Sequence, residues 1–293
     1  MIELEPKYLP AIGRLFSPIV LNNLIDNGHS SYLSEVIVNS GLINKINTQI
    51  TLKEFFEKTY NLLFKKYKNE YIYKNVLINK VLLGIHSLNT STMLTEFRVG
   101  QCKADVLLIN GTSTVYEIKS EYDSFTRLEN QILSYLEVFD YINVITSISH
   151  ADKLISILPQ NVGILVLTNK RTISTIRKPI SNIKNINTSY LFDSLRKSEY
   201  TRIIADFYGY IPSVPNTQIY KVCKNLYCKI PSKEAHDRTM NILKRRTSKT
   251  LLKDFVNSAP SLSAYAISIY GNENQLRKLQ ALFDQNITTL LFP

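Results

Sequence analysis

Apolar positions recur at helical spacing in the first part of the chain. Residues 51–67, TLKEFFEKTYNLLFKKY, place these positions on one helical face. Thr51 and Glu54 form a capping-box pattern at the start of this run. A second helix is predicted from Glu70 to about Ile85. We therefore expect residues 1–65 to form an N-terminal helical segment that packs on a core.

The pattern changes near residue 94, where short β-prone runs begin. TEFRV, KADVLLI and STVYEIKS are separated by turn signals at Gly100 and Asn110-Gly111, and Asn-Gly between two such runs is a strong hairpin signal. RLENQILSYLEVF returns to helical spacing, and YINVITS and VGILVLT are apolar runs typical of strands covered on both faces. The order predicts an α/β core over residues 66–185, with a mixed β-sheet flanked by helices.

Helical spacing returns after about residue 185. It runs through YLFDSLRKSEYTRIIADFYG and TMNILKRRTSKTLLKDFVNS. The stretch IPSVPNTQIY between them is predicted to be a loop, because two prolines bracket it. We therefore expect residues 186–293 to be a mainly helical C-terminal region.

Charge is distributed unevenly along the chain. Residues 1–150 hold 14 Lys/Arg and 15 Asp/Glu, a net charge of −1, whereas residues 151–293 hold 21 and 9, a net charge of +12. Clustered positive charge attracts phosphate backbones, although a solvated basic surface has the same composition. Lys244, Arg245 and Arg246 form one candidate phosphate-contacting patch, with an exposed helix face as the alternative. Arg127 is a further candidate, either for phosphate or for a pair with Asp123.

Composition also bears on the cellular compartment. No apolar run approaches the length needed to cross a bilayer, and the start MIELEPKYLP lacks the pattern of a signal peptide. Three cysteines are most simply interpreted as free thiols in a reducing cytosol. We expect a cytoplasmic protein that does not enter a membrane.

The candidate chemistry lies in the predicted hairpin. Glu117 and Lys119, in YEIKS, are two residues apart and so project from the same face of a strand. The preceding strand carries Asp105, which the Asn110-Gly111 turn should bring near the end of the Glu117 strand. Converging carboxylates make a hard oxygen site suited to Mg²⁺. A lysine beside them can polarise a water molecule and stabilise developing negative charge. Without this context, a capping Asp and an exposed strand pair would be the simpler interpretation.

A family resemblance supports this interpretation. The stretch EFRVGQCKADVLLINGTSTVYEIKSEYDSFTRLENQILSYLEVFDYINVIT resembles the PD-(D/E)XK nuclease superfamily. It is most similar to the bacterial sce7726 family, whose members share a G…AD…NG…YEIKS…D…RL…Q…Y…FD pattern. YKNEYIYKN also fits, so the resemblance extends over residues 50–200. Ala104 stands where a proline usually precedes the aspartate.

The resemblance implies a restriction-endonuclease-like core and a set of roles. Asp105 and Glu117 would be metal ligands, together with the backbone carbonyl of Ile118, and Lys119 would be the catalytic lysine. Gln131 and Tyr135 match the Q…Y helix signature of RecB-like nucleases, in which these residues line the site. The implied cofactor is Mg²⁺ or Mn²⁺.

Nucleases of this kind usually draw a further acid from the helix before the sheet. Glu70, in NEYIYKN, is the preferred candidate, and Glu96, in TEFRV, is the competitor. Each also has a structural interpretation. An acid in the first turn of a helix is favoured by the helix dipole, and a charge on an edge strand discourages aggregation.

The sequence therefore predicts a metal-dependent endonuclease that hydrolyses phosphodiester bonds, most simply those of DNA. Two alternatives remain open. One is a nucleic-acid-binding module with weak or absent catalysis, and the other is a nuclease effector of a defence or toxin system that is active only with a protein partner. A homodimer is also compatible with the sequence.

Overall fold

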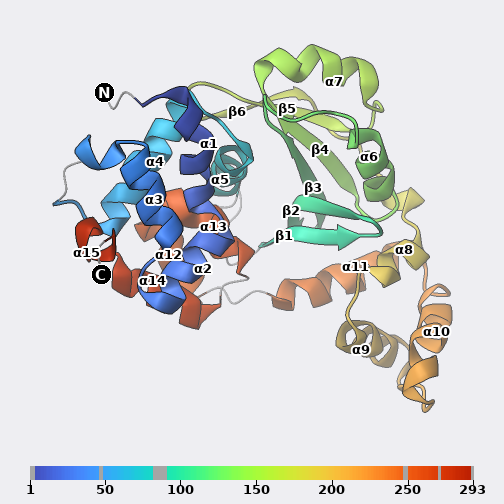
Figure 1. Ribbon diagram of the computed structural model, residues 1–293. Helices are drawn as coiled ribbons and strands as arrows, with labels where there is room; N and C mark the ends of the chain where they lie inside the picture. Colours follow the sequence, from blue (N-terminus) through green and yellow to red (C-terminus); the bar gives the residue numbers. More distant parts are fainter. Residues whose placement is uncertain (1–3, 46–48, 82–90, 247–249, 270–271, 292–293) are drawn as a thin grey trace.

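A computed structural model describes residues 4–45, 49–81, 91–246, 250–269 and 272–291. Its centre is one mixed sheet with helices on both faces (Figure 1). The helices that precede the sheet are η1 (Pro6–Tyr8), α1 (Leu9–Gly13), η2 (Arg14–Phe16), α2 (Pro18–Asn27), α3 (Ser31–Asn39), η3 (Leu42–Asn44), α4 (Leu52–Lys66) and α5 (Glu70–Lys80).

The sheet has six strands in the order of the sequence. They are β1 (Thr92–Val99), β2 (Cys102–Asn110), β3 (Thr112–Lys119), β4 (Tyr141–Thr146), β5 (Gly163–Leu167) and β6 (Ile173–Arg177). Strands β1, β2 and β3 form an antiparallel meander. Strand β4 is parallel to β3, β5 is parallel to β4, and β6 is antiparallel to β5. The mixed sheet flanked by helices is thus confirmed.

Local signals explain the elements near the site. Gly100 and Gly111 adopt φ values of 55° and 75°, which glycine tolerates because it lacks a Cβ atom, and they form the two hairpin turns. The capping box of Thr51 and Glu54 is present at the start of α4. Helix α5 begins at Glu70, as predicted, and ends at Lys80. Positions 82–85 of the predicted helix lie outside the described residues.

The remaining helices follow β3. They are α6 (Leu128–Leu136), η5 (Ile148–His150), α7 (Ala151–Ile157), η6 (Ile183–Asn185), α8 (Thr188–Asp193), α9 (Lys197–Tyr208), α10 (Asn216–Tyr227), α11 (Ser232–Leu243), η7 (Lys244–Arg246), α12 (Thr250–Ser258), η8 (Pro260–Leu262), α13 (Ser263–Ser268), α14 (Glu273–Leu282) and α15 (Ile287–Leu291). None of the helices in the described ranges is both long and apolar enough to cross a membrane.

Two apolar clusters form on the two faces of the sheet. The first joins α1–α5 to α12–α15, and it includes side chains of β2 and β3 such as Val106 and Ile118. The second joins the opposite face, through residues such as Leu107 and Val115, to α6 and α8–α11. Residues 186–293, predicted as one region, therefore contribute to both clusters. Figure 1 shows α12–α15 among the N-terminal helices and α8–α11 on the other side of β1.

Candidate functional site

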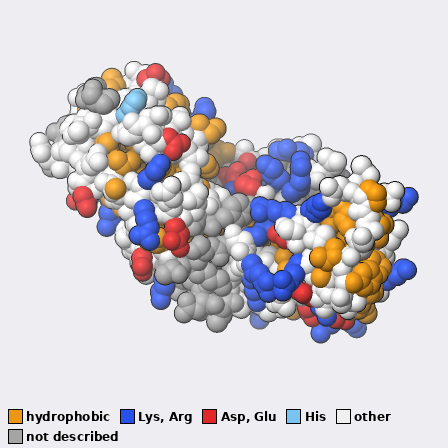
Figure 2. Space-filling view, turned by 90° about the horizontal axis from the view of Figure 1, so that it is seen from below, with side chains coloured by type: hydrophobic (Ala, Val, Ile, Leu, Met, Phe, Trp, Pro, Cys, Tyr) orange, Lys and Arg blue, Asp and Glu red, His pale blue; other side chains and the backbone are white. Residues whose placement is uncertain are grey.

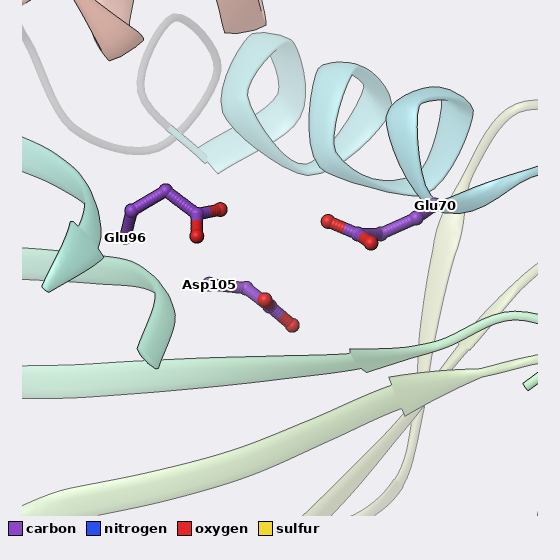
Figure 3. A group of neighbouring side chains, drawn as sticks. All are labelled: Glu70, Glu96 and Asp105. Atoms are coloured by element: carbon purple, nitrogen blue, oxygen red, sulfur yellow. The ribbon is translucent and has the colours of Figure 1, made fainter. Parts of the chain in front are cut away.

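Three carboxylates meet at one end of the β1–β2 hairpin. Glu70 is the first residue of α5, Glu96 lies in β1 and Asp105 lies in β2. One oxygen atom from each lies within 4.8 Å of the other two, and the three side chains point toward one another (Figure 3). Lys74, one turn after Glu70 on α5, has its Nζ 2.9 Å from Glu70 Oε1 and 2.8 Å from Glu96 Oε1. The group therefore holds more acidic than basic side chains.

The backbone of β1 directs Glu96 into this group. Glu96 has a φ of 53°, in the left-handed region that side chains rarely adopt. Leu94 and Phe97 are three residues apart, so regular alternation would place them on opposite faces of the strand. Both lie in the second apolar cluster, the one that includes α6, so the alternation breaks between them. Consecutive residues Thr95 and Glu96 therefore line one cavity of about 380 Å³, beside Glu70 and Lys74.

Asp105 occupies the point where β2 and β3 separate. Their paired register begins at Val106 and Tyr116. One residue beyond Val106, Asp105 Oδ2 accepts a hydrogen bond of 2.7 Å from the backbone N–H of Ile118. The N–H and C=O of one strand residue point to the same side. The carbonyl of Ile118 therefore faces the Asp105 side as well.

A second group of side chains lies between β3 and α6. Lys119 Nζ donates to Glu117 Oε1 at 2.9 Å and to Gln131 Oε1 at 3.0 Å. The Tyr135 hydroxyl lies 2.7 Å from both Glu117 Oε2 and the carbonyl oxygen of Lys103, and it donates to one of them at a time. Glu117 is 1% exposed. Lys119 and Tyr135 contact its two oxygens, and it lies outside the group of three carboxylates.

Burial and neighbouring charges act on two carboxylates at this end of the sheet. Burial raises the pKa of Asp105 well above its usual range, the neighbouring Glu117 carboxylate raises it further, and Lys74 opposes both effects. Burial also raises the pKa of Glu117, against the charge of Lys119 and the hydrogen bond from Tyr135. Buried carboxylates that repel each other are stabilised by nearby positive charge. The three carboxylates offer oxygen ligands of the kind that Mg²⁺ or Mn²⁺ prefers, and the Lys74 ammonium lies beside two of them.

The residues predicted from the sequence thus lie in two adjoining groups. Glu70 and Glu96, proposed as competitors, both approach Asp105. The second group holds the other predicted residues, namely Glu117, Lys119, Gln131 and Tyr135. The sequence analysis missed Lys74, although its position four residues after Glu70 is the usual spacing of a helical ion pair.

The predicted basic patch needs a correction. Arg246 lies 2.5 Å from Glu199 in an ion pair whose side chains are each 10% exposed, so it is not available to a phosphate. Lys244 is half-buried and Arg245 is exposed. Arg127 is also exposed, at the N-cap of α6. Asp123 accepts hydrogen bonds from the N–H and the hydroxyl of Ser120. Figure 2 shows Lys and Arg side chains gathered near the middle of one face, beside a small group of Asp and Glu.

The fold and the site define a mixed α/β protein with an acidic centre at one end of its sheet. The chain belongs to the bacteriophage P4 protein cII family, which matches residues 64–265. This match extends from α4 to α13 and includes every residue of the two groups described above. No curated protein matches the chain.

One solved structure resembles part of the chain. It is the SPO1766 protein of unknown function from Silicibacter pomeroyi, with 18% sequence identity and a TM-score of 0.29. The match covers 40% of this chain and 80% of that protein. At this TM-score the likeness carries no conclusion about fold or function.

Proposed function

We propose that this protein is a metal-dependent nuclease of the PD-(D/E)XK type, with a restriction-endonuclease-like core, that hydrolyses phosphodiester bonds of DNA. One observation carries the proposal. Three carboxylates converge within 4.8 Å of one another, from α5 and the first two strands of a meander. The Glu117–Lys119 pair occupies the third strand. The sce7726-like motif runs through the same residues, so resemblance and geometry point to the same chemistry.

The side chains divide into ligands and positioning groups. Asp105, with Glu70 or Glu96 and the carbonyl of Ile118, would hold Mg²⁺ or Mn²⁺, and Glu117 would join them once its contact with Lys119 rearranges. A metal bound here would supply positive charge to the phosphate and lower the pKa of a water ligand. Lys119, held by Gln131 at 3.0 Å, would stabilise the charge that develops on the phosphate oxygens. Tyr135 would orient Glu117 through their 2.7 Å hydrogen bond.

A cleavage assay tests the proposal directly. Purified protein is incubated with plasmid, linear duplex, single-stranded DNA and RNA, in Mg²⁺, Mn²⁺ or EDTA. We expect cleavage of DNA in either metal and none in EDTA, with activity lost in Asp105→Asn and Glu117→Gln. Glu129→Gln and Asp152→Asn, which remove exposed carboxylates elsewhere, are the matched controls.

Metal binding tests the site independently of turnover. Calorimetry should show that Mn²⁺ binds the wild type and binds the Asp105→Ala/Glu117→Ala variant much more weakly. Mn²⁺ binding undiminished in that variant would show that the metal site lies elsewhere.

A nucleic-acid-binding module without catalysis is the second candidate, and one observation favours it. Both carboxylate oxygens of Glu117 already accept hydrogen bonds, from Lys119 and Tyr135, so protein groups already occupy this proposed metal ligand. In the same assays, this candidate predicts salt-dependent DNA binding with no cleavage in either metal.

A further inference from the structure

Two like charges face each other at the tip of the β1–β2 hairpin. Arg98 and Lys103 are register partners, in a hairpin whose turn includes Gly100. Both side chains are exposed. Like charges directly opposite each other on antiparallel strands destabilise a sheet. The pair therefore opposes folding unless an anion compensates it.

The pair shares a face of the hairpin with the acidic site. Phe97, Val99 and Ala104 all lie in the cluster under α6, so Arg98 and Lys103, which alternate with them, project from the opposite face. Glu96 precedes Arg98 by two residues, and Asp105 follows Lys103 by two. Both acids lie toward α5 (Figure 3). A row of two acids is thus followed by a row of two bases along one surface.

Structural roles do not account for the pair. Within the described parts of the chain, neither side chain forms an ion pair: the nearby acids Glu70 and Glu96 are bridged by Lys74 instead. A charge on the edge strand β1 would discourage sheet-to-sheet association, which gives Arg98 a role. Lys103 lies on β2, an inner strand, where edge protection requires no charge.

We propose that Arg98 and Lys103 bind the DNA phosphate next to the one held at the acidic centre. This inference rests on the proposed nuclease function. It implies that the bound DNA strand runs from the acidic centre toward the tip of the β1–β2 hairpin. Two residues along a strand span about 6.7 Å, a length comparable to one nucleotide step along a DNA backbone. The exposed pair presents two cationic donors to one phosphate group, and the phosphate relieves their mutual repulsion.

DNA binding at varied salt is the test, with Ca²⁺ in place of Mg²⁺ and again in EDTA. The probe is a fluorescein-labelled DNA duplex, and the variant is Arg98→Ala/Lys103→Ala. Arg277→Ala/Lys278→Ala is the matched control, because it removes one exposed Arg and one exposed Lys from α14. Loss of the one phosphate contact that the pair shares should lower the log–log salt slope by about 0.9. The control should keep the wild-type slope.

Further variants separate the contact from folding and from net charge. Arg98→Lys/Lys103→Arg keeps both charges and should keep the slope. The single variants Arg98→Gln and Lys103→Gln should each lower it by less than the double variant does, because the remaining cation still contacts the phosphate. A thermal midpoint at or above that of the wild type is expected for all of them, because the repulsion is unchanged or relieved.

The outcomes distinguish this proposal from the nuclease assignment. A wild type that cleaves DNA, with an unchanged slope in Arg98→Ala/Lys103→Ala, overturns the phosphate subsite alone. The subsite is also overturned if the slope of Arg277→Ala/Lys278→Ala falls as much as that of Arg98→Ala/Lys103→Ala, because the change in net charge would then explain both results. If the slope falls as expected but no metal supports cleavage, the phosphate subsite stands and the nuclease assignment fails.

Discussion

Glu96 shows how one residue's backbone conformation helps to build the site. A non-glycine residue in the left-handed region costs about 1–3 kcal/mol, and Glu96 adopts a φ of 53°. This conformation directs the carboxylate toward Asp105 and Glu70, where Lys74 pairs with both glutamates. Such costs are typical of sites whose geometry serves a ligand. The left-handed backbone of Glu96 is therefore consistent with the proposed metal site.

A substitution of Lys119 tests the proposed catalytic role of this single residue. Lys119→Ala leaves the three converging carboxylates in place, so Mn²⁺ should still bind, as measured by calorimetry. The rate of DNA cleavage should fall by about 10²–10³-fold, the usual effect of removing one group that stabilises the transition-state charge.

Two comparisons make the Lys119 result specific. Lys278→Ala, which removes an exposed lysine from α14, should cleave like the wild type. A Lys119→Ala protein with wild-type turnover would mean that this lysine only balances the charge of Glu117.

Helix α11 is held to the sheet by a buried histidine. His236 is fully buried, and its Nε2 lies 2.8 Å from the hydroxyl of Ser113 in β3. That hydroxyl also accepts a hydrogen bond from the N–H of Asp140. Its second lone pair and its own proton let it either accept from or donate to His236 Nε2, according to the tautomer of the ring. Burial lowers the pKa of His236, against the opposite influence of Asp237 and Asp140. Burial of this contact between α11 and β3 thus favours the neutral ring.

Acid should weaken this contact between elements. Because the pKa of His236 is lowered in the folded state, the unfolded state binds more protons below the ordinary value of 6.5. Stability should therefore fall as pH drops below that value. Urea unfolding at about pH 7.5 and about pH 5 should show a smaller loss in His236→Gln than in the wild type.

An exposed histidine provides the control for this pH effect. His29 lies on the surface, between α2 and α3, so His29→Gln should lose as much stability as the wild type over the same range. Equal losses in His236→Gln and the wild type would contradict the assigned role of the buried ring.

The whole molecule separates charge according to its two apolar clusters. Residues 151–246 hold 17 Lys/Arg and 6 Asp/Glu, whereas residues 247–293 hold 4 and 3. The basic excess therefore belongs to the part of the chain that includes α8–α11, and the nearly neutral helices α12–α15 complete the N-terminal cluster. The proposed nucleic-acid contact of the C-terminal half would therefore draw its positive charge from residues 151–246.

The C-terminal helices should be required for the acidic site. Asn75 of α5 donates to the carbonyl of Pro260 and accepts from the N–H of Ala264, both at 2.9 Å. Truncation after Arg246 removes these contacts and uncovers the N-terminal cluster. We expect the truncated chain to bind a hydrophobic dye and to lose cooperative urea unfolding, because α5 and Glu70 lose their support.

A point variant checks the same coupling in the full-length chain. Phe255 is fully buried in that cluster, so Phe255→Ala should lower the free energy of unfolding by about 3–5 kcal/mol. Tyr210→Ala, at a side chain that is 53% exposed, should change it by less than about 0.5 kcal/mol. A truncated chain that unfolds cooperatively like the wild type would show that the N-terminal cluster is stable without α12–α15.

The sequence by itself determined the local features of this protein. The Asn110-Gly111 turn and the alternation of Glu117 and Lys119 depend only on neighbouring residues, so the meander and the shared face of this pair could be predicted. Contacts between distant segments depend on packing, which no local pattern encodes. Only the tertiary structure decided that Glu70 and Glu96 both reach Asp105. It also decided that Arg246 is buried against Glu199, and that the C-terminal region divides between the two faces of the sheet.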